Sequence, residues 1–331
     1  MSLADYRIFQ SIIIMNSNAN PKSQLVSIVI PTYNRAEEVS NCLNSVLNSS
    51  HQNLDVVVVD DASSDNTYEL LTNKYKDDKR IRVHRNPTNL LPAVTRNVGL
   101  SMAHGEYTLF LDSDNIVEPD LITKLLEIFA DPSVGLATAL SIQSTNNTIW
   151  TLGASINLLT SRPCNLHEGS SFNEIGATGL YPTIYSPNLF MVPTKLARQI
   201  GGFDEGYGFI YEETDFGYKI AKAGYKGVIC ADVTTLHVGH LTEKEAGKLR
   251  ALGVESPRRT YCFARNRTKF MRRWAPWWGL ISYHLFFLPL FTLYYTYTAL
   301  KNRRPDIAKA YIAGSFAGLI GIYKTKLYEA G

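Results

Sequence analysis

Pairs of carboxylates follow two short apolar runs of the chain. Asp60 and Asp61 end a run of valines, and Asp112 and Asp114 stand on either side of a serine after the run Tyr107–Leu111. Neighbouring carboxylates repel one another unless a cation joins them, and a D-x-D pair at a strand end offers an oxygen ligand to Mg²⁺ or Mn²⁺. Such an ion takes its other ligands from water and substrate phosphates, which suits a nucleoside diphosphate. Any single pair could instead form an Asx turn or a helix cap.

Alternating strand-like and helix-like segments predict how these carboxylates are positioned. Near-continuous apolar runs rich in β-branched residues indicate strands buried on both faces, as in a parallel sheet. The predicted strands are 26–30, 55–59, 81–84, 107–111, 134–140, 188–192 and 226–231. The predicted helices are 35–48, 66–76, 92–103, 118–130 and 212–223. This order predicts an α/β fold with a doubly wound, mostly parallel sheet, in which ligands bind beyond the carboxyl ends of the strands.

Length and composition limit the class of protein. The chain has 331 residues, of which 45% are hydrophobic and 19% charged, so it is expected to fold, either as one large α/β domain with an appendage or as two medium domains. A net charge of +3 is too small to imply a nucleic-acid partner. The four cysteines include no CxxC pair, which argues against a zinc ribbon and against a dithiol redox site. The polar composition of Asn16–Gln24 predicts that residues 1–24 are an extension outside the fold.

Several sequence blocks, in their order along the chain, resemble one known family. They are VSIVIPTYNR at 26–35, VVDDASSDNT at 58–67, TRNVG at 95–99 and FLDSDN at 110–115. Together they closely resemble the family 2 glycosyltransferases of GT-A fold. GGFDE at 201–205 and YEETDF at 211–216 resemble the second half of that pattern, particularly its rhamnosyltransferase-like branch. The resemblance covers residues 25 to about 270.

The resemblance implies a site for a nucleotide-sugar donor. In the family, the blocks that match Pro31, Tyr33 and Asp61 hold the nucleotide base and ribose, with Asp60 a less certain neighbour. The same comparison implies that Arg96 lies by the base or the diphosphate and that Asp112 approaches the ribose. A surface ion pair is the alternative role for the arginine.

A divalent cation, Mg²⁺ or Mn²⁺, is implied as the cofactor. The resemblance assigns Asp114 as its ligand, between the two phosphates of the donor. His237 best matches a family histidine that can complete the metal shell, with Thr242 in the hydroxyl position; His240 lies nearby. The alternative for His237 is a capped structural histidine.

A base is required as well, because direct displacement at the anomeric carbon removes a proton from the acceptor hydroxyl. The family usually has Glu-Asp where this chain has Glu212 and Glu213, so the resemblance assigns the base to Glu213, one methylene longer than aspartate. Glu212 and Asp215 are the alternatives. Each could instead belong to a helix N-terminus that favours acidic residues through its dipole.

The C-terminal region has a different composition. Seven cationic residues lie between Arg258 and Arg273, three tryptophans follow, and Leu280–Leu300 runs for 21 residues without a formal charge. This length matches the roughly 20 residues that span a bilayer, so we expect attachment to membrane lipids at the cytoplasmic face. The sequence leaves the topology open between a spanning hairpin and a re-entrant or interfacial helical pair. RNA binding and a buried core hairpin are the alternatives to membrane attachment. The run 310–322 is too short to span alone, but Gly314 and Gly318 form a small-xxx-small packing motif.

These observations predict an inverting, metal-dependent glycosyltransferase that transfers a sugar from a nucleotide-sugar donor to a lipid-linked or polysaccharide acceptor. The expected organisation is an extension at 1–24, a GT-A domain at 25–257 and membrane-associated helices at 258–331. The alternatives are a catalytically inactive sugar-nucleotide binding module and a nucleotidyltransferase. A nucleotidyltransferase usually presents a basic Gly-rich loop after its first strand, whereas this chain has Pro31-Thr32-Tyr33-Asn34. The sequence does not specify the oligomeric state.

Overall fold

The computed structural model describes residues 23–238, 249 and 252–323. Residues 1–22 of the predicted N-terminal extension, together with His240 and Thr242, lie outside the described residues.

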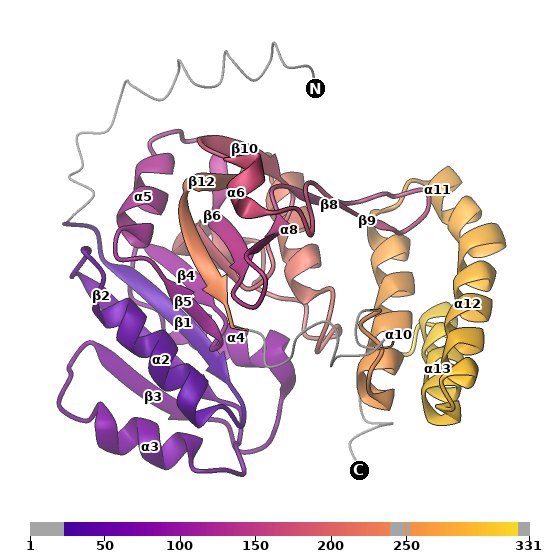
Figure 1. The fold of residues 1–331 in the computed structure, drawn as a ribbon, viewed down its shortest axis with the longest axis horizontal. Helices are drawn as coiled ribbons and strands as arrows, with labels where there is room; N and C mark the ends of the chain where they lie inside the picture. The colour runs from indigo at the N-terminus through magenta and orange to yellow at the C-terminus, as the bar shows by residue number, and fades with distance from the viewer. Residues whose placement is uncertain (1–22, 239–248, 250–251, 324–331) are drawn as a thin grey trace.

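A ten-stranded mixed sheet forms the centre of the fold, in the order β10-β12-β6-β11-β4-β1-β2-β3, with β5 and β7 pairing at its side (Figure 1). Its parallel strands on one side of β11 are β1 (Val26–Thr32), β2 (Leu54–Asp60), β3 (Ile81–Arg85) and β4 (Tyr107–Leu111). The predicted alternation is confirmed, since α2 (Ala36–Leu47), α3 (Thr67–Lys74) and α4 (Leu91–Met102) connect them. All seven residues of β2 are buried, as its run of valines predicts.

The other part of the sheet contains the antiparallel pairs. Its strands are β5 (Asn115–Val117), β6 (Val134–Gln143), β7 (Thr148–Thr151), β10 (Leu180–Thr183), β11 (Leu189–Pro193) and β12 (Lys226–His237). The helix α5 (Leu121–Ile128) lies between β5 and β6 in the chain. β11 runs antiparallel to both β4 and β6, and β12 runs parallel to β6. The carboxyl ends of β1, β2, β4 and β12 therefore meet at one edge of the sheet.

Helices cover both faces of this sheet. Between β7 and β10 lie the short strand pair β8 (Ala154–Ile156) and β9 (Pro163–Asn165) and the helix α6 (Phe172–Ile175). α7 (Thr194–Gln199) and α8 (Glu212–Lys222) pack with α4 on one face. Their core includes the aromatic group Phe110, Phe190, Phe203 and Phe216, in which the rings of Phe203 and Phe216 stack with centroids 4.5 Å apart. α2 and α5 cover the other face.

The C-terminal helices stand beside the sheet domain. They are α10 (Pro257–Trp274), α11 (Trp277–Ser282), the π-helical turn η2 (Tyr283–Phe287), α12 (Leu288–Lys301) and α13 (Pro305–Ile320). Figure 1 shows α10 between the sheet domain and the α12–α13 pair. The small residue at Gly318 allows α13 to approach α10 closely, because an added Cβ there would lie 2.7 Å from Thr268 Cβ.

The structure corrects the prediction for this region. Among the residues described, none of the helices is both long enough and apolar enough to cross a lipid bilayer. The uncharged run Leu280–Leu300 is distributed over α11, η2 and α12, and residues such as Tyr283, Leu288 and Ala299 are buried against neighbouring helices. The predicted membrane-associated region is therefore not supported as a spanning segment. α10 begins at Pro257, beside the predicted boundary between 25–257 and 258–331, and that division remains a prediction.

Candidate active site

Arg96 gathers three carboxylates at the carboxyl edge of the sheet. It lies on α4, is 3% exposed, and its guanidinium donates to Asp112 Oδ1 at 2.6 Å, to Glu213 Oε1 at 2.6 Å and to Glu212 Oε1 at 3.0 Å. Asp112 follows β4, and the two glutamates begin α8. The structure thus brings together the predicted donor residues Arg96 and Asp112 and the predicted base Glu213. We call these four side chains the Arg96 cluster.

The Arg96 cluster carries three carboxyl groups but a single guanidinium. Burial raises the pKa of Glu213 to about 8; repulsion from Asp112 and Glu212 adds to this rise, and the attraction of Arg96 opposes it. Burial raises the pKa of Glu212 as well. A carboxylate whose pKa lies near neutrality can accept a proton during a reaction and release it afterwards. The environment of Glu213 therefore suits a general base.

Exposure distinguishes the two glutamates. Glu213 keeps 18% of its side-chain surface exposed, whereas Glu212 keeps 7%. Within the described part of the chain, Glu212 Oε2 has no hydrogen-bond partner. An acceptor hydroxyl can reach Glu213 more easily than Glu212. The assignment of the base to Glu213 remains a prediction that this geometry favours.

Asp215 faces away from the Arg96 cluster. Its side chain is fully buried and accepts hydrogen bonds from Trp274 Nε1 at 2.8 Å and from the Tyr207 hydroxyl at 3.3 Å, and it pairs with Arg273 at 3.3 Å. Two residues along an α-helix turn a side chain by about 200°, which explains why Asp215 points to α10 while Glu213 points to Arg96. These contacts show that Asp215 links α8 to α10.

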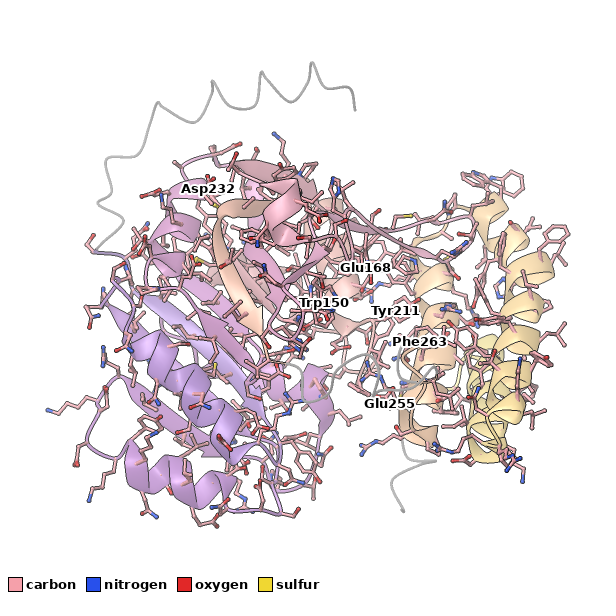
Figure 2. All side chains as sticks on the ribbon, viewed as in Figure 1. Trp150, Glu168, Tyr211, Asp232, Glu255 and Phe263 are labelled. Carbon is pink, nitrogen blue, oxygen red and sulfur yellow. The ribbon has the colours of Figure 1, made fainter. Side chains whose placement is uncertain are left out.

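The backbone before Glu212 is held in an uncommon conformation. Ile210 and Tyr211 have φ values of 67° and 75°, in the left-handed region that β-branched and bulky residues rarely adopt. Asn266 of α10 donates from Nδ2 to the backbone oxygens of Tyr207, Phe209 and Ile210, at 2.9, 2.8 and 2.7 Å. Figure 2 labels Tyr211 and, on α10, Phe263, whose rings lie 6.4 Å apart. The first C-terminal helix therefore fixes the segment that presents both glutamates.

Asp114 points to a different set of partners from Asp112. It pairs with the guanidinium of Arg35, accepts from Asn115 Nδ2 at 3.2 Å and lies 3.5 Å from His237 Nε2. Burial alone would raise its pKa, but the hydrogen bond from His237 and the charge of Arg35 outweigh burial and lower the pKa to about 2. Asp114 is therefore ionised at neutral pH, as a metal ligand must be.

The oxygen and nitrogen ligands that Asp114 and His237 offer fit a divalent cation that takes its other ligands from a diphosphate and water. Among the residues described, no group of three or more His, Cys, Asp or Glu side chains could hold a metal ion. One carboxylate, Asp114, and one imidazole, His237, lie close together, and Mg²⁺ or Mn²⁺ commonly takes its other ligands from substrate phosphates and water. The rings of His237 and of Trp150 on β7, labelled in Figure 2, lie nearly perpendicular with centroids 4.6 Å apart. This contact fixes the imidazole beside the carboxylate.

The remaining predicted donor residues lie at the ends of β1 and β2. Pro31 belongs to β1, and the Tyr33 side chain directly after that strand is 44% exposed. Asp61 is buried, and its carboxylate accepts from Asn86 Nδ2 at 2.8 Å and from the backbone N–H groups of Leu90 and Leu91, both at 2.9 Å. Asp61 thus anchors the start of α4, the helix that carries Arg96. The contacts of all three residues with a donor remain predictions.

Sequence reasoning missed two residues of this edge. Arg35 pairs with Asp114, and Trp150 packs against His237. Arg35 ends the first sequence block, shortly after a predicted strand, so its expected place at the carboxyl edge of the sheet was the available signal. Trp150 gave none, because residues 141–185 show no sustained period from which a face could be assigned.

Residues 27–188 match the family described as Glycosyl transferase family 2. An "Uncharacterized glycosyltransferase" of Haemophilus influenzae is 40% identical over 102 residues, which are 31% of this chain and 41% of that relative. The "Putative teichuronic acid biosynthesis glycosyltransferase TuaG" of Bacillus subtilis is 36% identical over 125 residues, which are 38% of this chain and 50% of that relative. The similarity therefore covers no more than half the length of either relative.

The fold is similar to a solved structure, "Mannosyltransferase PcManGT from Pyrobaculum calidifontis in complex with GDP-Man and Mn2+". The TM-score is 0.55 at 17% identity, and the match covers 97% of this chain and 95% of that chain. At such low identity the likeness concerns the fold alone. The comparisons thus show that residues 27–188 are similar to glycosyl transferase family 2 and that the mixed α/β fold of the chain is GT-A-like.

Proposed function

We propose that this chain is an inverting, metal-dependent glycosyltransferase that moves a sugar from a nucleotide-sugar donor to a lipid-linked or polysaccharide acceptor. The observation that carries the proposal is the convergence of Asp112, Glu212 and Glu213 on Arg96, at the same sheet edge as the Asp114–His237 pair. This arrangement supports the proposal because direct displacement requires a base for the acceptor hydroxyl and a group that stabilises the leaving diphosphate.

In this proposal the acceptor oxygen attacks the anomeric carbon as its proton passes to a carboxylate oxygen of Glu213. The bond between the anomeric carbon and the diphosphate oxygen breaks, and the diphosphate leaves with the electron pair. Attack on the side opposite the leaving group inverts the configuration. Arg96 holds the Glu213 carboxylate in place and offsets part of the negative charge around it. Asp114 and His237 would hold the divalent cation, which when bound offsets the charge on the diphosphate.

The substrate class is also part of the proposal. The name of the Bacillus subtilis relative includes teichuronic acid biosynthesis, and the solved neighbour contains GDP-Man. Both support a nucleotide-sugar donor and a glycan acceptor here. We propose transfer of a hexosyl or deoxyhexosyl group, within the rhamnosyltransferase-like branch that the second-half blocks resemble, at the cytoplasmic face of the cell membrane.

The experiment that tests this function changes the base alone. Glu213→Gln keeps the shape of the side chain but removes its ability to accept a proton, so turnover should fall by roughly a hundred to ten thousandfold while donor affinity stays nearly unchanged. The assay follows labelled sugar from a panel of nucleotide sugars into lipid extract and polysaccharide, with Mn²⁺ present. Binding of the donor is measured separately by calorimetry.

A matched control is Glu127→Gln on α5, an exposed glutamate on the opposite face of the sheet, which should behave as the wild type. Full turnover by Glu213→Gln, with Asp215→Asn or Glu212→Gln inactive, would show that the base is assigned to the wrong carboxylate. Donor binding without transfer by the wild type to any acceptor would favour the sugar-nucleotide binding module instead.

A further inference from the structure

The helices α11 to α13 expose apolar side chains along one side. On the first stretch these recur every three to five residues, at Trp277, Ile281, Leu285, Leu290, Leu293 and Tyr297. Trp277 is 75% exposed and Leu293 70%, values that are unusual for large apolar side chains in a water-soluble surface. We call these side chains, together with the exposed residues Ile312, Phe316 and Ile320 of α13, the apolar face.

The opposite side of the same helices is already used for packing. Tyr283, Leu288 and Ala299 are buried in clusters with α10 and with residues of the sheet domain. α10 is itself fixed to the sheet domain, because Arg265 and Asn266 donate to backbone oxygens of residues 206–210. In Figure 1 the α12–α13 pair lies on the far side of α10 from the sheet. The apolar face is therefore directed away from the sheet domain and its edge of carboxylates.

Cationic residues flank the apolar face at both ends. Arg272 is exposed near the start of α11, and Lys301 and Arg303 are exposed at the end of α12. Between residues 257 and 323 the chain has a single acidic residue, Asp306, which is paired with Arg304 at 2.7 Å. Among the residues described, no acidic side chain pairs with Arg272, Lys301 or Arg303, although Arg272 donates to the backbone oxygens of Gly318 and Leu319. An apolar stripe bordered by positive charge fits a surface that is apolar within and anionic at its boundary.

We propose that the apolar face inserts into one leaflet of an anionic lipid bilayer, with α11, η2 and α12 lying along the membrane surface. A lipid bilayer supplies both required features, acyl chains for the apolar side chains and anionic headgroups for Arg272, Lys301 and Arg303. A second copy of this chain fits less well. Both ends of the face are cationic, so pairing two faces in either direction brings like charges together.

An orientation along the surface follows from the packing. A spanning arrangement would carry α10 into the bilayer as well, whereas α10 exposes Arg272 and Arg273, and none of the helices described is both long enough and apolar enough to cross. This inference extends the membrane location included in the proposed function. Its test needs no transferase activity, so the two can fail independently.

The test uses the full chain with vesicles of equal parts phosphatidylcholine and phosphatidylglycerol. The chain should sediment with these vesicles and stay bound at about 1 M salt, because burial of apolar side chains is not screened as charge attraction is. Vesicles of phosphatidylcholine alone should bind less. Acyl-chain bromination should quench the fluorescence of Trp277 and Trp278, and Trp277→Phe/Trp278→Phe should remove that quenching.

Leu285→Ser/Leu293→Ser should lower the vesicle partition coefficient at least about tenfold. The substitutions remove two apolar side chains whose burial among the acyl chains would favour binding. The matched control is Leu166→Ser, an apolar residue that is 49% exposed beside β9, and it should bind as the wild type does. Circular dichroism verifies that each variant is folded. Equal binding by the double variant, a wild-type chain that stays in the supernatant, or a dimer that forms through this face without lipid would each overturn the proposal.

Discussion

Two buried arginines, Arg96 at the sheet edge and Arg267 on α10, have opposite surroundings. Arg96 contacts three carboxylates within 3.0 Å. Arg267 lies over the rings of Phe263 and Phe291, each with its centroid 4.4 Å away, and donates to the hydroxyl of Tyr311 at 3.2 Å. In the described part of the chain, no acidic side chain forms an ion pair with Arg267. The same guanidinium group thus serves a charged network in one region and an aromatic one in the other.

The contrast separates what each region does. Around Arg96, burial raises the pKa of Glu213, the two neighbouring carboxyl groups add to the rise, and the result is a carboxylate able to take up a proton. Around Arg267 the partners are neutral, and the contacts are cation–π contacts and hydrogen bonds that join α10 to α12 and α13. We infer that the first arrangement serves chemistry and that the second serves attachment of the C-terminal helices. Three substitutions can break or sharpen this comparison.

Arg96→Met should have the largest effect. It leaves Asp112, Glu212 and Glu213 without their shared cation, and removal of one partner from a buried ion pair costs about 3 kcal/mol or more of the free energy of unfolding. The loss should grow as pH rises from 5 to 8, because the uncompensated carboxyl groups are neutral when protonated and repel one another when ionised. Urea denaturation at a series of pH values measures this dependence.

Arg96→Met/Glu212→Gln serves as the control for charge, since it removes one of the three carboxylates. It should recover part of the lost stability at pH 8 and little at pH 5. A variant Arg96→Met whose stability loss is the same at every pH would mean that shape, and not charge, is what Arg96 contributes.

Glu212→Gln should move the pH dependence of turnover. A base with a pKa of about 8 gives a rate that rises with pH and levels off above that value. Replacing Glu212 removes a neighbouring negative charge, and Arg96 then interacts with two carboxylates instead of three. Both changes favour the ionised form of Glu213. The midpoint of the rise in kcat/KM should therefore fall to lower pH. A midpoint that stays in place or rises would separate the titrating group from the Arg96 cluster.

The predicted elements of the sheet domain agree closely with the structure because their signals are local. The valines of β2, for example, show burial on both faces, and α8 begins at Glu212, where the acidic block predicts a helix. The contacts of Arg96 were not predictable in this way. Its partners lie 16, 116 and 117 residues further along the chain, so only the folded arrangement brings them together.

The C-terminal region shows the limit of composition. Leu280–Leu300 has the length and apolar character of a spanning segment. In the structure, however, Tyr283 is buried and Leu293 is exposed, because only one side of these helices packs against α10. A sequence pattern that contains both buried and exposed apolar residues does not reveal which side is packed. Composition treats the seven cations of α10 as one basic group, whereas the structure buries Arg265 and Arg267 and leaves Arg272 at the surface.

Arg267→Met should have the smallest of the three effects. Methionine keeps an unbranched chain between Phe263 and Phe291 and leaves no carboxylate without a partner. It loses the cation–π contacts and the hydrogen bond to Tyr311, for which we expect a cost of about 1–2 kcal/mol in the free energy of unfolding. That cost should be nearly constant from pH 5 to 8, since the partners of Arg267 are aromatic rings and the Tyr311 hydroxyl, whose pKa burial raises above that of a free tyrosine. Urea denaturation of both arginine variants under identical conditions makes the comparison direct. If Arg267→Met instead loses stability steeply as pH rises, an acidic group must balance Arg267, and the contrast between the two regions fails.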